Sequence, residues 1–234
     1  MKIGGIVQAR MNSDRLPGKV LQQVGGKPML EYLLERLRQC TSLDSIVIAT
    51  SIDQSDDLVE RFCHERGADC CRGSLLNVAS RFTDALNVYQ FDAFVRVSGD
   101  SPLLDPRLVD RGVELFRRGE FDLVTNVFPR TYPRGQSVEV IRTETFRRTA
   151  ETMEGVDEAE HVTLFFYRHP EMFRILNFGA DADYSGVHLG VDSIADIERF
   201  AGIVAAMDGP HWQYGLAEIL EIYESVSSGR SARA

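Results

Sequence analysis

Short apolar runs alternate with helical stripes along the first half of the chain. Residues 3–7, 45–50 and 93–98 are brief, mostly apolar segments that end in polar residues, as buried parallel strands do. Between and after them, apolar residues recur at the spacing of one helical face, which predicts helices over about 28–37, 58–67, 78–89 and 105–118. This alternation predicts an α/β fold with a mostly parallel sheet and right-handed crossovers.

The rhythm changes after residue 127, where Pro129, Pro133 and Gly135 interrupt it. We expect a small inserted lobe over about 128–172 and a core formed by 1–127 and 173–226. Together these make one domain over 1–226, followed by a flexible tail at 227–234. The elements expected in this half are strands at 137–141, 173–178 and 187–191 and helices at 144–153, 157–168, 194–207 and 215–226.

Composition places the chain among ordinary globular proteins. It has 234 residues, 44% of them hydrophobic and 26% charged, and no apolar run approaches the about 18 residues of a membrane span. We therefore expect a cytoplasmic protein with no membrane partner. The net charge of −9 argues against nucleic-acid binding, which needs a basic excess. The four cysteines indicate reduced packing residues, and a zinc site at Cys63, His64 and Cys70 is the weaker alternative because the paired-ligand spacing is missing.

Positive charge gathers in the loop that follows the first strand. Residues 1–30 carry five cations and one acid, a local charge of +4, and Arg10, Arg15 and Lys19 lie in this loop. Loops at the carboxyl ends of parallel strands bind ligands in open α/β sheets, and guanidinium groups fork onto phosphate oxygens. The loop is neither a Walker A loop nor a dinucleotide fingerprint. It predicts a polyphosphate site made of side chains, and solvated surface cations are the alternative.

Two acids follow strand-like segments. Asp100 follows the segment 93–98 after one glycine, and Asp192 directly follows the segment 187–191. Mg²⁺ is usually bound by one or two carboxylates together with substrate phosphates, so two acids at neighbouring strand ends could share one ion. The alternatives are that Asp100 caps a turn before Pro102 and that Asp192 or Ser193 only caps the next helix.

The motifs that carry this chemistry resemble those of the cytidylyltransferase family, which includes the sialic acid and KDO synthetases, and in particular its spore coat polysaccharide branch. The resemblance covers nearly the whole chain, in order. The matching segments are residues 8–21, 25–32, 96–106 and 189–192.

The resemblance implies a nucleotide-diphospho-sugar transferase fold, a Rossmann-like three-layer sandwich. It also implies CTP as donor, a sugar or sugar acid as acceptor, Mg²⁺ dependence and a homodimer joined through the lobe. CMP would pass from CTP to the acceptor for surface polysaccharide synthesis, with release of pyrophosphate. The alternatives are a nucleotidyltransferase of the same fold that uses another nucleotide and a catalytically silent nucleotide-binding protein.

Residue roles follow from the same resemblance. The nucleotide would contact Ala9, Arg10, Arg15, Lys19 and Arg81, and the metal would be held by Asp100 and Asp192. Arg10, Lys19 and Asp100 would carry catalysis. The implied acceptor contacts are Gln136, Glu139, Glu160 and His161. The residues themselves leave other readings open: a solvated helix face for Arg81, a solvent-facing strand position for Glu139 and a satisfied helix histidine for His161.

The chain departs from the family pattern at three places. Asn12 replaces a usual glycine, and Asn tolerates the left-handed backbone that a turn requires. Asp14 puts a negative charge beside the expected phosphates, and Ile194-Ala195 replaces the usual Pro-Glu after the second metal acid. The changes at Asp14 and Ile194-Ala195 are the reason to retain the alternative of a catalytically silent nucleotide-binding protein.

Overall fold

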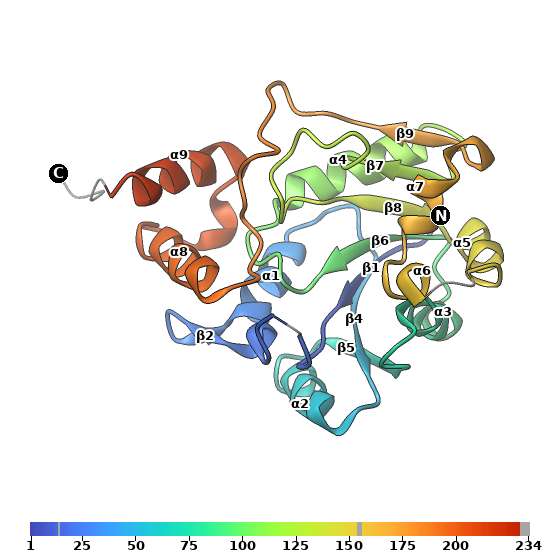
Figure 1. Ribbon diagram of the computed structural model, residues 1–234, viewed down its shortest axis with the longest axis horizontal. Coiled ribbons are helices and arrows are strands. Elements are labelled where there is room, and N and C mark those ends of the chain that lie inside the picture. Colours follow the sequence, from blue (N-terminus) through green and yellow to red (C-terminus); the bar gives the residue numbers. More distant parts are fainter. Residues whose placement is uncertain (14, 154–155, 230–234) are drawn as a thin grey trace.

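A seven-stranded sheet forms the centre of the molecule in this computed structural model, which describes residues 1–13, 15–153 and 156–229. The strand order is β5-β4-β1-β6-β8-β7-β9, parallel except where β8 pairs with β6 and β7. A separate hairpin, β2 with β3, lies to one side (Figure 1). The strands are β1 (Ile3–Gln8), β2 (Gln23–Val24), β3 (Lys27–Pro28), β4 (Ser45–Ser51), β5 (Asp69–Gly73), β6 (Ala93–Ser98), β7 (Leu123–Thr125), β8 (Glu139–Arg142) and β9 (Ile175–Asn177).

Helices cover both faces of the sheet, which makes the expected three-layer α/β sandwich. Apolar residues of α1, α2 and α4 pack in one buried cluster, and those of α3, α5 and α7 pack in a second cluster on the opposite face. The helices are α1 (Met29–Leu37), α2 (Asp57–Glu65), α3 (Val78–Tyr89), α4 (Pro106–Arg117), α5 (Thr143–Ala150), α6 (Val156–Glu160), α7 (Leu164–Arg168), α8 (Ile194–Ala205) and α9 (Leu216–Ser227). None of the helices in the described ranges is long and apolar enough to cross a membrane.

The strand β1 shows how the sequence pattern produces two layers. Ile3 and Val7 belong to the first cluster, whereas Ile6 belongs to the second, because successive side chains in a strand point to opposite faces. Both neighbours of β1 are parallel to it. The loops that leave β1 and β6 therefore emerge at the same edge of the sheet, where the expected site lies.

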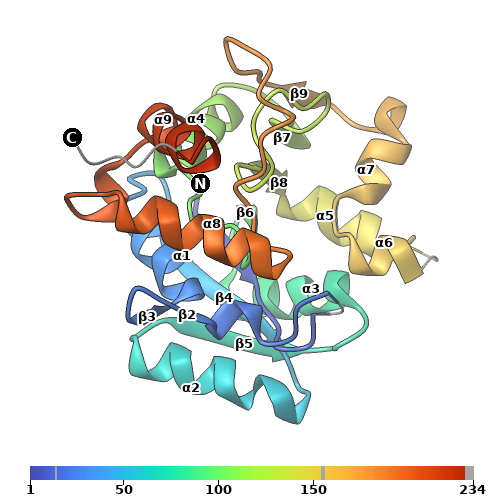
Figure 2. The same ribbon diagram turned by 60° about the vertical axis from the view of Figure 1, so that its left-hand side comes forward.

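A third apolar cluster joins the pair α8 and α9 to α1. The ring of Tyr32 meets the ring of Phe200 at 5.1 Å between centroids, nearly edge to face. The buried Arg36 guanidinium donates hydrogen bonds to the carbonyls of Leu104, His211 and Tyr214. Figure 2 shows α8 and α9 beside α1, away from the group formed by α5, α6 and α7.

The structure differs from the expected elements in two places. Residues 187–191 form no strand: their backbone makes one isolated bridge, between Arg134 and His188, and crosses the carboxyl ends of the strands. The apolar alternation there reflects packing of Leu189 and Val191 in the third cluster. The helix expected over 157–168 is two short helices, α6 and α7, separated at residues 161–163.

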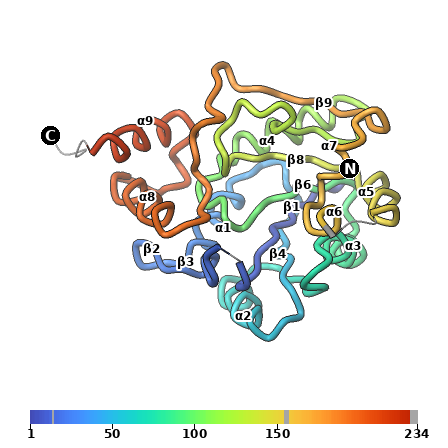
Figure 3. The backbone as a smooth tube through the Cα atoms, viewed as in Figure 1, coloured from blue at the N-terminus to red at the C-terminus, as the bar shows by residue number. Residues whose placement is uncertain are grey.

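The segment 128–172 contributes to two parts of the fold. Strand β8 belongs to it and is hydrogen-bonded inside the central sheet, whereas α5, α6 and α7 gather at one end (Figure 3). Helix α9 extends to Ser227, and residues 230–234 of the expected tail lie outside the described residues.

Candidate active site

Backbone hydrogen bonds bring the ends of β1 and β6 tightly together. The Gly99 amide donates to the carbonyl of Gln8 at 2.8 Å, and the Ala9 amide donates to the carbonyl of Ala49 at 3.2 Å. A Cβ atom at Gly99 would lie 2.9 Å from that Gln8 oxygen and 3.1 Å from the Ala9 Cβ, which is too close for either contact. Only glycine at position 99 therefore allows this close approach.

The ammonium of Lys19 lies between the two acids that the sequence singled out. Its Nζ atom is 2.8 Å from Asp100 Oδ2, 2.8 Å from Asp192 Oδ1 and 2.8 Å from the carbonyl oxygen of Val191. These three partners use all three ammonium hydrogens. The side chain of Lys19 is only 9% exposed, so the ion pairs are largely shielded from water.

This pairing determines the charge state of Asp100. Burial alone would raise the pKa of Asp100, but the charge and hydrogen bond of Lys19, with smaller contributions from Ser98 and Arg96, hold that pKa below its usual value. The carboxylate is therefore ionised at neutral pH. An ionised carboxylate is the form that can bind a cation.

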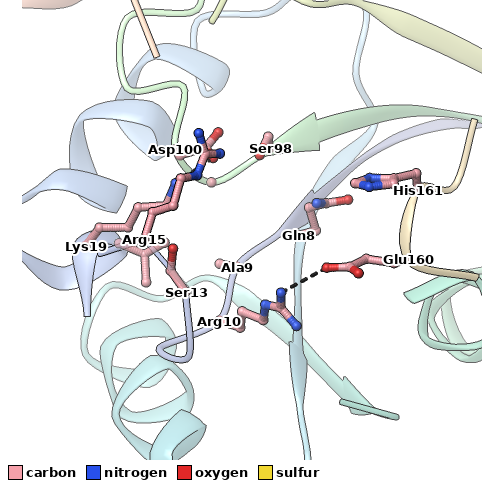
Figure 4. A pocket seen from close by; sticks show the side chains of 12 residues that line it. Gln8, Ala9, Arg10, Ser13, Arg15, Lys19, Ser98, Asp100, Glu160 and His161 are labelled. Atoms are coloured by element: carbon pink, nitrogen blue, oxygen red, sulfur yellow. Dashed lines mark hydrogen bonds and ion pairs between the residues drawn. The ribbon is translucent and has the colours of Figure 1, made fainter. Parts of the chain in front are cut away.

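Two arginines extend the charged surface outward from Lys19. Arg15 reaches Asp192 Oδ1 at 2.9 Å, and its side chain is 72% exposed. Arg10 pairs with Glu160 at 3.0 Å, across the gap between the β1 loop and the end of α6 (Figure 4). Asp14, between these arginines in sequence, lies outside the described residues.

These groups line one cavity of about 360 Å³, which we call the nucleotide cavity. Its walls are mostly polar and carry three of the expected phosphate ligands, and Glu160 and His161 close the side opposite Lys19 and Asp100 (Figure 4). Glu160 is the last residue of α6, and His161 is the first residue of the break between α6 and α7. The lining residues are Gln8, Ala9, Arg10, Ser13, Arg15, Lys19, Val20, Ser98, Gly99, Asp100, Glu160 and His161.

Arg81 is buried rather than solvated, so the open helix face considered for it is wrong. Its side chain is 1% exposed and donates hydrogen bonds to the carbonyls of Ser74 and Leu75, at 3.0 and 3.2 Å. Burial lowers the pKa of Arg81, and the nearby charge of Arg10 lowers it further against the opposing effect of Asp56. Arg81 lines a smaller cavity of about 80 Å³ that shares Ala9, Arg10 and Glu160 with the nucleotide cavity.

Two of the four expected acceptor residues lie beneath the surface. Gln136 is fully buried: its amide nitrogen donates to the Leu103 carbonyl at 2.7 Å, and its amide oxygen accepts from the Asp105 amide at 2.9 Å. Both ends of the Gln136 amide are therefore bonded to backbone, and the side chain has no exposed surface to offer a ligand. The geometry therefore assigns Gln136 to holding the loop before α4 rather than to the acceptor.

Glu139 is also buried, which corrects the solvent-facing alternative. It is 2% exposed and pairs with Arg96 at 2.7 Å, and it accepts a hydrogen bond from the hydroxyl of Tyr167 at 2.6 Å. Burial alone would raise the pKa of Glu139, but Arg96, Tyr167 and Thr163 together hold it below the usual value. The ion pair with Glu139 therefore holds the guanidinium of Arg96 in place.

A metal would have to be held by Asp100 and Asp192 together with a ligand. Among the residues that the structure describes, no three His, Cys, Asp or Glu side chains gather as a metal site, so nothing supports the zinc alternative at Cys63, His64 and Cys70. Two carboxylates that contact the same ammonium fit the requirement of Mg²⁺, which takes one or two carboxylates plus phosphates and water.

Sequence reasoning missed three arginines near these acids: Arg96, Arg130 and Arg134. They line a second cavity, of about 180 Å³, that shares Ser98 and Asp100 with the nucleotide cavity. A charged residue inside the otherwise apolar strand 93–98 was a usable signal for Arg96. Arg130 and Arg134 lie in a Pro-rich connection whose course no local pattern indicates.

Known proteins share both the sequence and the fold. The model of the cytidylyltransferase family matches residues 5–203. The spore coat polysaccharide biosynthesis protein SpsF of Bacillus subtilis is 34% identical over 177 residues, which are 73% of this chain and 72% of that protein. A cytidylyltransferase structure from Leptospira borgpetersenii superposes with a TM-score of 0.93 at 28% identity and covers 100% of this chain and 98% of that one.

A more distant structure, that of CMP:2-keto-3-deoxy-manno-octonic acid synthetase complexed with CTP, has a TM-score of 0.67 at 20% identity. It covers 88% of this chain and 99% of that one, and it shows that the two share a fold. The family model spans most of the chain, including the end of β1, the loop with Lys19, Asp100 and Asp192. This protein belongs to the cytidylyltransferase family.

Proposed function

We propose that this protein transfers CMP from CTP to a sugar or sugar acid and releases pyrophosphate, in a pathway that builds a surface polysaccharide. Its family membership supports the reaction type, and the relative named for spore coat polysaccharide biosynthesis supports the pathway. The distant structure complexed with CTP supports the choice of donor.

One observation carries the proposal: Lys19 and Asp100 lie at one side of a cavity that also contains Arg10 and Arg15. Asp192 contacts Lys19 from the adjoining cavity. A triphosphate needs several cations at fixed positions, and the cavity supplies three. Ala9 and Arg10 would contact the nucleotide, and Arg15 and Lys19 would bind its phosphates.

The reaction forms one bond to phosphorus and breaks one. The acceptor hydroxyl oxygen attacks the α-phosphorus of CTP in line and releases its proton to water. The bond from the α-phosphorus to the oxygen that bridges it to the β-phosphate breaks, and pyrophosphate leaves with that bonding pair. Most catalysis in such transfers comes from positioning and charge neutralisation. Lys19, buried against the two acids, is placed to stabilise the charge that develops on the leaving pyrophosphate.

Asp100 and Asp192 would hold Mg²⁺, which when bound would neutralise phosphate charge and act as a Lewis acid. Lys19 and Arg15 already occupy these carboxylates in the ligand-free protein. Binding of the nucleotide gives both cations new partners on its phosphates. Asp100 and Asp192 would then be free to hold the metal.

The test is pyrophosphate release with CTP, UTP, ATP and GTP, with and without Mg²⁺, against a panel of sugars and sugar acids. We expect release only with CTP, and only when the metal is present. Asp100→Asn should abolish turnover, whereas the matched control Asp57→Asn, at an exposed position of α2, should leave it unchanged. Preference for another nucleotide would mean that CTP is not the donor. Mg²⁺-dependent turnover in Asp100→Asn at the wild-type rate would mean that Asp100 does not hold the metal.

We also propose a homodimer joined through residues 128–172. Exposed apolar side chains in this segment support it: Phe128 is 39% exposed and Met172 is 63% exposed. Light scattering of the full chain should give twice the monomer mass. Met172→Glu should shift it toward the monomer, and a wild-type protein that is monomeric at all concentrations would contradict the proposal.

A further inference from the structure

Asp56 is a fully buried acid that lies outside the walls of the nucleotide cavity. Within residues 1–13, 15–153 and 156–229, no lysine, arginine or histidine lies at ion-pair distance from its carboxylate. Burying a charged group costs free energy unless hydrogen bonds compensate. The groups that bond to Asp56 therefore indicate what this acid does in the fold.

The carboxylate of Asp56 joins two segments instead of capping its own helix. Asp56 occupies the N-cap position of α2, where an aspartate typically accepts a hydrogen bond from the first amides of the helix, but its side chain makes no such bond. Its Oδ2 atom accepts from the amide of Ser51 at 3.0 Å and from the Ser51 hydroxyl, at the end of β4. Its Oδ1 atom accepts from the amide of Met11, in the loop that follows β1, at 2.6 Å.

Met11 is the point at which the β1 loop closes on itself. Its carbonyl accepts from the amide of Ser13 at 3.0 Å and from the amide of Gly18 at 2.7 Å. Arg10 directly precedes Met11, and Lys19 directly follows Gly18. The side chains of Arg10 and Lys19 line the nucleotide cavity (Figure 4). The position of Met11 therefore sets where the backbone of both cations lies.

An ionised carboxylate suits this junction better than an amide would. Both oxygens of Asp56 accept hydrogen bonds, and an ionised carboxylate is a pure acceptor. Hydrogen bonds to an ionised acceptor are shorter and about twice as strong as neutral ones, and the bond to Met11 is short. The charge of Asp56 also raises the pKa of the buried Arg81, against the larger opposing effect of burial. Asparagine has the same shape but only one side-chain acceptor oxygen, so it cannot hold Met11 and Ser51 in the same way.

We propose that Asp56 is a positioning residue for the triphosphate of the donor: by holding the Met11 amide, it keeps the cations of the β1 loop in the arrangement that binds the phosphates. Asp56 itself contacts no substrate and acts through the backbone of this loop. A loop that is ordered before the ligand arrives loses less conformational entropy on binding. This inference rests on the proposed function, because it takes the nucleotide cavity to bind a triphosphate.

Titration calorimetry without Mg²⁺ tests this role with three ligands at constant ionic strength: CTP, inorganic tripolyphosphate and cytidine. Tripolyphosphate reports on the phosphate ligands alone, and cytidine reports on the rest of the nucleotide site. The variant is Asp56→Asn, and there are two matched controls. Ser51→Ala removes the hydroxyl bond to the same carboxylate but keeps the bond to Met11. Asp53→Asn removes one charge from the same turn, where the side chain of Asp53 accepts from Ser55.

We expect Asp56→Asn to bind CTP and tripolyphosphate about tenfold or more weakly than the wild type does, and cytidine equally well. Apparent affinity falls in proportion to the fraction of molecules that hold the binding arrangement, and loss of a charge-assisted hydrogen bond can lower that fraction about tenfold. Both controls should bind all three ligands as the wild type does, even where urea denaturation shows lower stability. A role in stability alone would not separate phosphate binding from nucleoside binding.

A measurement on the wild type covers the case in which Asp56→Asn does not fold. Hydrogen exchange followed by NMR should show the Met11 amide protected in the ligand-free protein, with its protection little changed by CTP. A Met11 amide that is unprotected until CTP binds would mean that the nucleotide, and not Asp56, orders the loop.

The inference is wrong if Asp56→Asn binds CTP and tripolyphosphate at the wild-type affinity, if it loses cytidine affinity by the same factor, or if Ser51→Ala weakens binding of the phosphate ligands equally. A wild type that binds tripolyphosphate but not CTP contradicts the proposed function instead, and the tripolyphosphate titration still decides the role of Asp56. A wild type that binds neither ligand overturns both.

Discussion

Replacing Lys19 by methionine should destabilise the ligand-free protein by about 3 kcal/mol, the low end of the cost of removing one partner from a buried ion pair. The side chain of Lys19 is 9% exposed, and its two acids are 28% and 21% exposed, so solvent compensates only in part. Methionine keeps the packing of the aliphatic stem but leaves Asp100 without the ammonium, and Asp192 keeps its pair with the exposed Arg15. The pKa of Asp100 should then rise, because burial acts without the opposing charge of Lys19.

Urea denaturation with and without Mg²⁺ measures this effect. Mg²⁺ should restore part of the stability of Lys19→Met, since the ion replaces the missing positive charge, and should change the wild type much less. The matched control is Lys27→Met, which removes a lysine paired with Glu35 at 2.7 Å outside the cavity, and Mg²⁺ should not rescue it. If Lys19→Met is as stable as the wild type, or if Mg²⁺ rescues both variants equally, the reasoning about the two carboxylates is wrong.

Three further predictions test other parts of the site. The lowered pKa of Asp100 contributes stability that is complete above about pH 4 and is lost as pH falls through the folded-state pKa, so acid titration of the wild type should show a loss that Asp100→Asn lacks. Gly99→Ala should cost about 1–3 kcal/mol and weaken CTP binding, measured by denaturation and calorimetry, because its Cβ would push apart the ends of β1 and β6; unchanged CTP affinity would contradict this. Gln136→Leu should lower stability by about 1–3 kcal/mol without changing the KM of the acceptor, and the reverse pattern would restore Gln136 as an acceptor contact.

The sequence predicted the sheet and most helices because their signals are local. The stripe formed by Leu30, Leu33, Leu34 and Leu37 predicted α1, and Asp105 with Pro106 marked the start of α4, as the structure confirms. The strand predicted over residues 187–191 was wrong. Its alternation of apolar residues reported burial against α8, and burial alone does not distinguish a strand from an extended crossing segment.

The part of the site that lies at the carboxyl ends of parallel strands could be predicted from the sequence. Parallel strands bring their carboxyl ends to one edge, so Lys19 and Asp100 were expected to lie close together, and they do. Their roles stay predictions. The burial of Gln136 and Glu139 was not predicted, because their partners Asp105 and Arg96 come from distant elements that no local pattern reveals.

The contacts of Lys19 also set an order of events during synthesis. Its partners lie 81 and 173 positions later in the chain, so a growing chain acquires Asp100 long before Asp192. At about 5–20 residues per second, the ribosome takes roughly 5 to 18 s to add the 92 residues between the two acids. Throughout that interval the lysine has one carboxylate instead of two. The arrangement that holds Lys19 between two carboxylates can therefore be completed only after residue 192 has been added.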